Sequence, residues 1–443
     1  MRWTTHAWPR PKACRKAAIS VAALLCAGVL SSCTPLGLNT ASANIQRQEP
    51  ASPFVLAATE TGPAIATPGD WTSRRVPELR AAFERHLYGP VPTELKGVEI
   101  ARRLVDPDYA GGLGTLEEID VQVGEGDNAG TYRIALALPR SATAAAPAPL
   151  ILGENFCGNR GTAGSDKLSP ETASGACQNT GFVARIVRLI FGKYIIESPN
   201  AQILARGYAY ANVFPSELVA DNAGEAPAGI ARFASLLPPD RAPNSLLGVW
   251  SASYGWSLDV LEVDPRIDAN RTAAYGHSRH GKAALIAGAL DPRIEAVISH
   301  QSGKGGATLT RSYAGETVRQ ITDAYGFWFA PAYAAWSDRE ADIPVDQHQL
   351  VAMLAPRPVL LGNGWKDVWS DPNGSFRAAL GADPAYKLMG ATGLAQAGMN
   401  DADTRGEIDF FIRAGGHGVR QVDWDHFLDF LDVWFSPREP DRR

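Results

Sequence analysis

Residues 275–282 read Tyr275-Gly276-His277-Ser278-Arg279-His280-Gly281-Lys282. A short run of small and apolar residues at 272–275 precedes this motif, and the helix-forming run Ala-Ala-Leu-Ile-Ala-Gly-Ala-Leu follows it at 283–290. A strand, a Gly-x-Ser-x-x-Gly turn and a helix predict a nucleophile elbow, the tight turn that lifts a serine clear of its neighbours. The N-terminus of the helix stabilises negative charge that develops beside such a serine. We therefore predict that Ser278 is a catalytic nucleophile.

Apolar segments alternate with helical ones along the rest of the chain. Continuous apolar strands that alternate with helices are what a parallel sheet requires when helices cover both of its faces. The pattern predicts an α/β protein with the α/β-hydrolase fold, a three-layer sandwich around a mostly parallel central sheet. No linker interrupts residues 76–437, so we expect one catalytic domain at 71–437. The expected strands lie at 98–105, 116–123, 131–138, 149–153, 208–213, 272–275, 296–299, 358–362 and 408–411, and the main helices at 77–87, 246–263, 283–290 and 424–435.

The first 32 residues have the pattern of a lipoprotein-type signal peptide. A basic region ends at Lys16, an apolar run covers 17–30, and the small-residue stretch Leu30-Ser31-Ser32-Cys33 follows. The apolar run is too short for a comfortable membrane-spanning helix. We expect lipidation at Cys33 and a flexible tether at 33–70, hence an exported periplasmic or outer-membrane lipoprotein of a bacterium. The alternative is an ordinary secretory signal in which Cys33 has no role.

Charge and composition exclude several classes of partner. The chain of 443 residues carries a formal net charge of −5, and removal of the signal peptide would take away five positive charges and no acid, leaving −10. A negative chain gives no reason to expect nucleic acid or an anionic membrane surface as partner. We therefore expect contact with the membrane only through the lipid anchor. The sequence does not indicate an oligomeric state.

Cys157 and Cys177 are the cysteines that remain beyond the predicted processing site. In an oxidising compartment we expect them to form a disulfide, worth about 3 kcal/mol in the chain-entropy model. The alternative is two unpaired, buried cysteines. The His and Cys spacings do not match a zinc site, and we predict neither a metal nor a cofactor.

Candidate partners for Ser278 follow two later strands. In this fold the acid and the histidine come after the nucleophile, each at the carboxyl end of a strand. Asp367 lies just past the strand at 358–362, and His417 lies on a glycine-flanked loop past the strand at 408–411. The histidine would take the serine proton, and the carboxylate would stabilise the imidazolium. Asp371 is the alternative acid, although its position before Pro372 favours a turn cap.

The other histidines have simpler explanations as packing or surface residues. They lack the glycine-rich setting of His417, or they flank the elbow where a ring can pack. These histidines are His277, His280, His300, His348 and His426. Two cations beside the nucleophile are further candidates. Arg279 can meet an oxyanion, or can form a structural ion pair, and Lys282 can point into the same pocket, or can be solvated.

The motif at 276–282 resembles the Gly-Cys/His-Ser-Arg-x-Gly-Lys nucleophile motif of the glucuronoyl esterases, carbohydrate esterase family 15. Segments that match in order cover most of 145–435. They are 258–271, His300-Gln301-Ser302-Gly303-Lys304-Gly305-Gly306, the segment 346–358, Asp367-Val368-Trp369-Ser370-Asp371-Pro372 and 413–429.

The resemblance implies serine hydrolysis, without metal, of the esters that join lignin alcohols to 4-O-methyl-glucuronic acid on xylan. It implies Ser278 as nucleophile, His417 as base and Arg279 as oxyanion stabiliser. Many members carry the triad glutamate where this chain has Gln301, and similar bacterial members carry the acid after the later strand, where Asp367 stands. Besides Lys282, the substrate-binding set that we expect is Gln301, Glu316 and Trp369.

We therefore predict an esterase of glucuronic acid esters that acts through an acyl-enzyme on Ser278. One alternative is an acetyl or general carboxylesterase on the same fold. Another is a non-catalytic, glycan-binding surface lipoprotein. The serine, histidine and aspartate together argue against the latter, because a binding protein has no physical need for all three.

Overall fold

The computed structural model describes residues 64–436, except 174, 176, 178–180, 313 and 402. The predicted signal peptide, Cys33 and most of the predicted tether lie outside these residues. The described residues include several before position 71, where we expect the catalytic domain to begin. Ile65 is buried in the core, and a short helix, α3 (Pro68–Asp70), is capped at its N-terminus by the side chain of Thr67.

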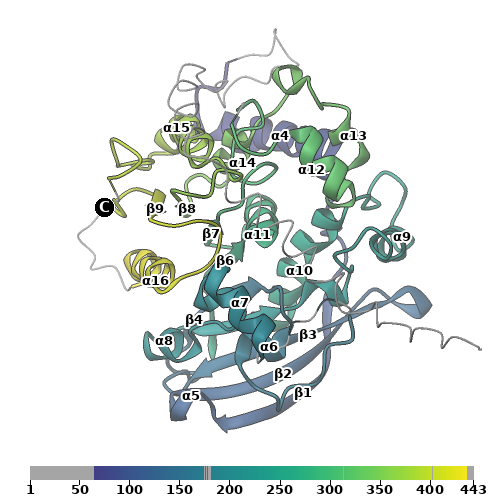
Figure 1. The fold of residues 1–443 in the computed structure, drawn as a ribbon, viewed down its shortest axis with the longest axis vertical. Helices are drawn as coiled ribbons and strands as arrows, with labels where there is room; N and C mark the ends of the chain where they lie inside the picture. The colour runs from purple at the N-terminus through teal and green to yellow at the C-terminus, as the bar shows by residue number, and fades with distance from the viewer. Residues whose placement is uncertain are drawn as a thin grey trace, which may run out of the picture.

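The described residues form a nine-stranded sheet in the order β1-β2-β3-β5-β4-β6-β7-β8-β9 (Figure 1). The first three strands pair antiparallel and join β5, also antiparallel. From β5 to β9 every neighbouring pair is parallel. The strands are β1 (Gly97–Asp108), β2 (Gly114–Val123), β3 (Gly130–Pro139), β4 (Ala148–Glu154), β5 (Ala209–Val213), β6 (Ile267–His277), β7 (Ala296–His300), β8 (Val359–Gly364) and β9 (Ile408–Arg413).

The parallel strands are buried because helices cover both faces of the sheet. Every residue of β5, β7 and β8 is buried, which explains their continuous apolar sequences. On one face α10 (Leu246–Leu261) and α11 (Arg279–Leu290) pack in the largest hydrophobic cluster. On the other face α8 (Asn200–Ala205) and α16 (Gln421–Phe435) form a second cluster with the strands (Figure 1). This arrangement confirms the predicted three-layer α/β-hydrolase sandwich.

The remaining helical segments lie in the connections between the strands and before β1. The segment expected as one helix at 77–87 is an α-helix that continues into a wider turn at 84–88. The other elements are η1 (Trp71–Arg75), α4 (Val76–Phe83), η2 (Glu84–Tyr88), α5 (Tyr109–Gly112), η3 (Gly126–Asn128), α6 (Asn159–Ala163), α7 (Phe182–Phe191), η4 (Lys193–Ile195), η5 (Pro215–Glu217), α9 (Ala226–Ala234), α12 (Val318–Tyr325), η6 (Gly326–Trp328), α13 (Pro331–Ala334), η7 (Glu340–Asp342), α14 (Gln347–Ala352) and α15 (Pro372–Leu388).

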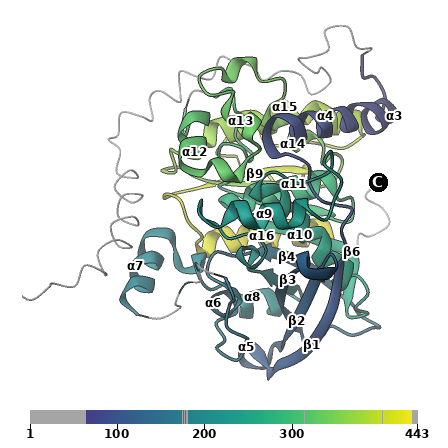
Figure 2. The ribbon, with the colours of Figure 1, turned by 90° about the vertical axis from the view of Figure 1, so that its right-hand side faces the viewer.

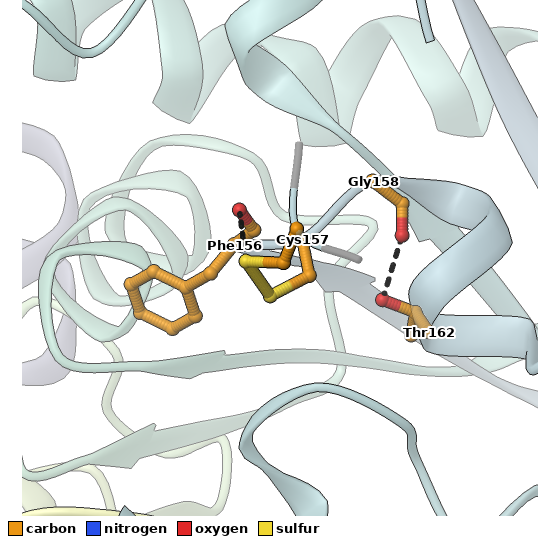
Figure 3. Close-up of a disulfide and its surroundings, with 5 residues drawn as sticks. Phe156, Cys157, Gly158 and Thr162 are labelled. Atoms are coloured by element: carbon orange, nitrogen blue, oxygen red, sulfur yellow. Dashed lines mark hydrogen bonds between the residues drawn. A yellow bond between two sulfur atoms is a disulfide. The ribbon is translucent and has the colours of Figure 1, made fainter. Parts of the chain in front are cut away.

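Helix α7 stands off the sheet at one side of the molecule (Figure 2). Cys177, which precedes α7 in the sequence, forms a disulfide with Cys157 (Figure 3). The sequence predicts this pairing. Cys157 belongs to a small hydrophobic cluster with Ala184 and Ile196, so the disulfide and the inner face of α7 pack together. Within the described residues, no helix has both the length and the apolar character needed to cross a membrane.

Candidate active site

Ser278 occupies a strained turn between β6 and α11. Its backbone has φ 57° and ψ −123°, a positive φ that non-glycine residues rarely adopt. The turn is possible because Gly276 lacks a side chain: a Cβ there would lie 2.1 Å from the carbonyl oxygen of His280. The Ser278 N–H donates to the carbonyl oxygen of His300 at 2.8 Å, which ties the turn to β7. This geometry is that of a nucleophile elbow.

His417 and Asp367 meet although they are fifty residues apart in the sequence. The Nδ1 atom of His417 lies 2.7 Å from Oδ2 of Asp367. Burial alone would raise the pKa of Asp367, but the charge and hydrogen bond of His417, with help from Ser370, lower it. The carboxylate is therefore ionised at neutral pH and holds the ring so that Nε2 is free to accept a proton.

Ser278, Asp367 and His417 line one cavity of about 400 Å³. The predicted residues Arg279, Lys282, Gln301, Glu316 and Trp369 line it too, so the structure brings the whole predicted site together. The further lining residues are Ile190, Phe191, Ser302, Gly303, Tyr325, Trp328, Lys366, Val368, Ser370 and Gly416.

Arg279 is the first residue of α11, and its guanidinium forms a structural ion pair, one of the two roles considered for it. Its guanidinium forms an ion pair with Asp221 and lies over the ring of Trp328 at 4.9 Å. Asp221 also accepts a hydrogen bond of 2.7 Å from the indole N–H of Trp328. The ion pair thus fixes a cation at the cavity. The first turn of α11, whose backbone N–H groups have no partner inside the helix, follows directly after Ser278.

Lys282 and Glu316 bring opposite charges to the same cavity. The ammonium of Lys282 donates to the carbonyl oxygen of Ser302 at 2.5 Å. Burial lowers the pKa of Lys282 to about 8, against a smaller opposing effect of Glu316. Burial also raises the pKa of Glu316, and the charge of Lys282 limits that rise. The two groups together offer donors and acceptors for hydroxyl groups of a ligand.

Gln301 lines the cavity, but its amide is engaged with the loop that carries His417. Its Nε2 donates to the carbonyl oxygen of Gly416 at 3.1 Å, and its Oε1 accepts from the N–H of Gly418 at 2.8 Å. An amide can make both bonds because it carries a donor and an acceptor, whereas an ionised carboxylate only accepts. Gln301 therefore forms hydrogen bonds with both peptide groups that flank His417.

The buried ion pair between Arg413 and Asp423 lies next to the loop that carries His417, and Arg413 also forms hydrogen bonds with that loop. Arg413 donates to the carbonyl oxygens of Gly416 and Gly418 at 2.9 and 2.7 Å, and its Nε lies 2.9 Å from Asp423 on α16. Three glycines would leave this loop with many accessible backbone conformations. The side chains of Gln301 and Arg413 restrict it to one.

The alternative acid and the other histidines near the elbow have structural roles. Asp371 caps α15 and accepts from the N–H of Gly374 at 3.0 Å. The ring of His280 stacks on Trp250, with 4.9 Å between ring centroids. His426 stacks on Phe411. In the described part of the chain, no group of three or more His, Cys, Asp or Glu residues is placed to hold a metal ion.

Several residues of the site escaped the sequence analysis, among them Asp221, Trp328, Ile190, Phe191 and Arg413. Asp221 lies in the loop between η5 and α9, and Ile190 and Phe191 are the last two residues of α7; the sequence carries no catalytic motif in either segment. A signal for α7 exists, however, because apolar residues recur at helical spacing between Gly181 and Gly192. Arg413 directly precedes the glycine-rich loop, and its pairing with Asp423 depends on the packing of α16.

Comparisons with known proteins agree with this geometry. Residues 193–390 match a family model described as glucuronyl esterase, fungi. A carbohydrate esterase named MZ0003, from an unknown prokaryotic organism, is 32% identical over 90% of this chain and 92% of its own. A glucuronoyl esterase structure from Solibacter usitatus is similar with a TM-score of 0.73 and 29% identity, over 88% of this chain and all of that one. A promiscuous CE15 esterase from a marine bacterial metagenome gives a TM-score of 0.72 and 28% identity, over 87% of this chain and 98% of that one.

Proposed function

The chain belongs to the glucuronoyl esterases of carbohydrate esterase family 15, and on that premise we propose that it hydrolyses esters of 4-O-methyl-glucuronic acid, such as those between lignin alcohols and glucuronoxylan. The observation that carries the proposal is that Ser278, on its elbow, lines the same cavity as the hydrogen-bonded His417–Asp367 pair. The neighbouring family members named for the same activity support the substrate class.

In the first half of the reaction, the hydroxyl oxygen of Ser278 attacks the ester carbonyl while Nε2 of His417 accepts its proton. Asp367 stabilises the resulting imidazolium through its 2.7 Å contact with Nδ1. The carbonyl oxygen gains a negative charge, which the N-terminus of α11 and Arg279 stabilise. The imidazolium then gives its proton to the leaving alcohol, and the glucuronoyl group remains on Ser278 as an ester.

In the second half, water takes the place of the alcohol. His417 accepts a proton from the water, the hydroxide adds to the acyl carbonyl, and the serine oxygen leaves with that proton. The products are glucuronic acid and the free enzyme. We assign Lys282, Glu316 and Trp369 to the sugar, because the two charged groups match its hydroxyls and the indole offers an apolar wall beside them.

Hydrolysis of methyl 4-O-methyl-glucuronate by the purified protein tests the proposal. We expect turnover that Ser278→Ala lowers by a factor of about 10⁴ or more, because the nucleophile is removed. The variant keeps the packing of the turn, so its thermal unfolding midpoint should match that of the wild type. Activity that survives the substitution would contradict the assignment of the nucleophile.

A general carboxylesterase is the second candidate, because one of the similar structures is described as a promiscuous member of the family. Turnover of aryl acetates separates the two. We expect kcat/KM for the glucuronate ester to exceed that for an aryl acetate, since only the former engages Lys282 and Glu316. Equal values for both esters would favour the general carboxylesterase.

We also propose that the protein is exported and lipid-anchored at Cys33. The basic region, the apolar run and the Leu-Ser-Ser-Cys stretch support this, and a disulfide suits an oxidising compartment. Metabolic labelling with a fatty acid should mark the wild-type chain in its bacterial host and not the Cys33→Ser variant. Equal labelling of both chains would contradict the anchor.

A further inference from the structure

Helix α7 presents an apolar face to solvent beside the active site. Phe182, Val183, Ile186 and Leu189 have exposed fractions of 76%, 62%, 39% and 81%. Their spacing places them on one side of the helix. Four large apolar side chains exposed within eight residues are costly in water unless a partner covers them.

The opposite side of α7 is fixed to the protein. Ala184 is buried with Cys157 and Ile196, and Val187 packs against the same cluster. Cys157 of this cluster forms the disulfide with Cys177, which precedes the helix in the sequence (Figure 3). The exposed face is therefore held in place and does not depend on a partner for its position.

The apolar face runs into the catalytic cavity. Ile190 lies four residues after Ile186 and seven after Val183, on the same side of the helix, and it lines the cavity together with Phe191. The cavity of about 400 Å³ suits a sugar and the ester bond. A larger alcohol must extend out of it across this rim.

The end of α7 is bonded to the loop that carries the catalytic histidine. The N–H of Val419 donates to the carbonyl oxygen of Phe191 at 2.7 Å, and the N–H of Tyr194 donates to the carbonyl oxygen of Val419 at 3.2 Å. His417 gives its proton to the leaving alcohol, so the alcohol must lie on the histidine side of the ester. Helix α7 borders that side, whereas Lys282 and Glu316 come from other elements of the cavity.

We propose that the exposed face of α7, formed by Phe182, Val183, Ile186 and Leu189, is a docking surface for the aromatic, apolar alcohol portion of the ester substrate. The inference rests on the proposed esterase function and adds to it a specificity surface outside the cavity. Bulky aryl alcohols gain contact with this face, and small alcohols such as methanol do not reach it.

The test compares two esters of glucuronic acid, one of methanol and one of 4-phenylbenzyl alcohol. In the double variant Phe182→Ser/Leu189→Ser we expect KM for the aryl ester to rise about tenfold, because two apolar contacts are lost. We expect the kinetic constants for the methyl ester to remain unchanged. Val263→Ser is the matched control, because Val263 is 75% exposed and lies outside the rim.

The outcomes separate the docking surface from the enzyme activity. A wild-type protein that hydrolyses neither ester would contradict the proposed function itself. Hydrolysis with the same ratio of kcat/KM for the two esters in wild type and double variant would overturn only the docking surface. Two further results would overturn the docking surface when the ratio is unchanged. Weaker sedimentation of the double variant with neutral phosphatidylcholine vesicles would assign α7 to a membrane. Loss of a dimer in analytical ultracentrifugation would assign α7 to contact with a second copy of the chain.

Discussion

Two histidine–carboxylate pairs lie beside the same nucleophile turn. Both make a short nitrogen–oxygen contact, but they differ in exposure to solvent and in the pKa shifts of their carboxyl groups. His417 and Asp367 lie 2.7 Å apart, and the histidine side chain is 31% exposed at the cavity. His280 and Glu154 lie 2.9 Å apart, and both side chains are almost completely buried. His280 is only two residues from Ser278 in the sequence, yet its ring stacks beneath the turn on Trp250.

The environment gives the two pairs different charge states. Burial raises the pKa of Glu154 well above its usual value, and burial lowers the pKa of His280 well below its own. Both shifts favour the uncharged forms of the pair, in which no carboxylate is present to stabilise an imidazolium. The pKa of Asp367 is lowered instead, because the interactions with His417 and Ser370 outweigh the effect of burial. A histidine–carboxylate contact works in catalysis only where the acid is ionised and the ring can reach the substrate.

The largest expected effect comes from neutralising the exposed pair. Asp367→Asn keeps the volume of the side chain but removes the charge that stabilises the imidazolium and selects its tautomer. We expect kcat to fall by about 10⁴, the magnitude known for this change in serine hydrolases. The measurement is hydrolysis of methyl glucuronate, with thermal unfolding as a check on folding. A loss below tenfold would show that another acid serves His417.

The catalytic pair could be predicted from the sequence because the fold places it at strand ends. The carboxyl ends of β8 and β9 lie at one edge of the sheet, so Asp367 and His417 had to meet near Ser278 once the strands were identified. The two residues also stand in loops whose glycines and turn residues mark them as ends of strands. The buried role of His280 depends instead on Glu154, a strand residue with no sequence signal of its own.

The rim of the site could not be predicted in the same way. Asp221 reaches Arg279 from a loop whose path depends on the packing of α9 and η5, and no periodic pattern in the sequence encodes that path. The role of Gln301 was equally hidden. The sequence shows only a neutral amide at this position, and the structure shows that amide bonded to Gly416 and Gly418.

An intermediate effect should come from the support of the histidine loop. Gln301→Ala removes two hydrogen bonds to the peptide groups around His417 while it leaves the Asp367 contact in place. At about 1 kcal/mol for each bond, we expect kcat to fall roughly 30-fold with KM nearly unchanged. Steady-state kinetics on the methyl ester measures both. A loss as large as that of Asp367→Asn would mean that Gln301 does more than position the loop, and would weaken the assignment of the acid.

The smallest effect on activity should come from Glu154→Gln, the matched change in the buried pair. The raised pKa favours the protonated carboxyl group, whose O–H can donate to Nδ1 of His280 while its other oxygen accepts from Ser253 at 3.0 Å. A glutamine amide reproduces both bonds. We therefore expect kcat/KM within a factor of about three of the wild type. A loss near that of Asp367→Asn would show that the buried pair takes part in catalysis after all.

The same variant should change how stability depends on pH. In the wild type, the folded state holds the Glu154 proton at pH values where the unfolded chain has lost it, because burial raises the folded pKa. The folded state then binds more protons than the unfolded state, so the free energy of unfolding falls as pH rises above the usual glutamate pKa, until the folded pKa is reached. Glutamine has no proton to lose, so in urea unfolding between pH 5 and about pH 8 the free energy of unfolding of Glu154→Gln, taken relative to that of the wild type, should rise with pH. Parallel profiles would mean that Glu154 is ionised in the folded protein, and the contrast in charge between the two pairs would then disappear.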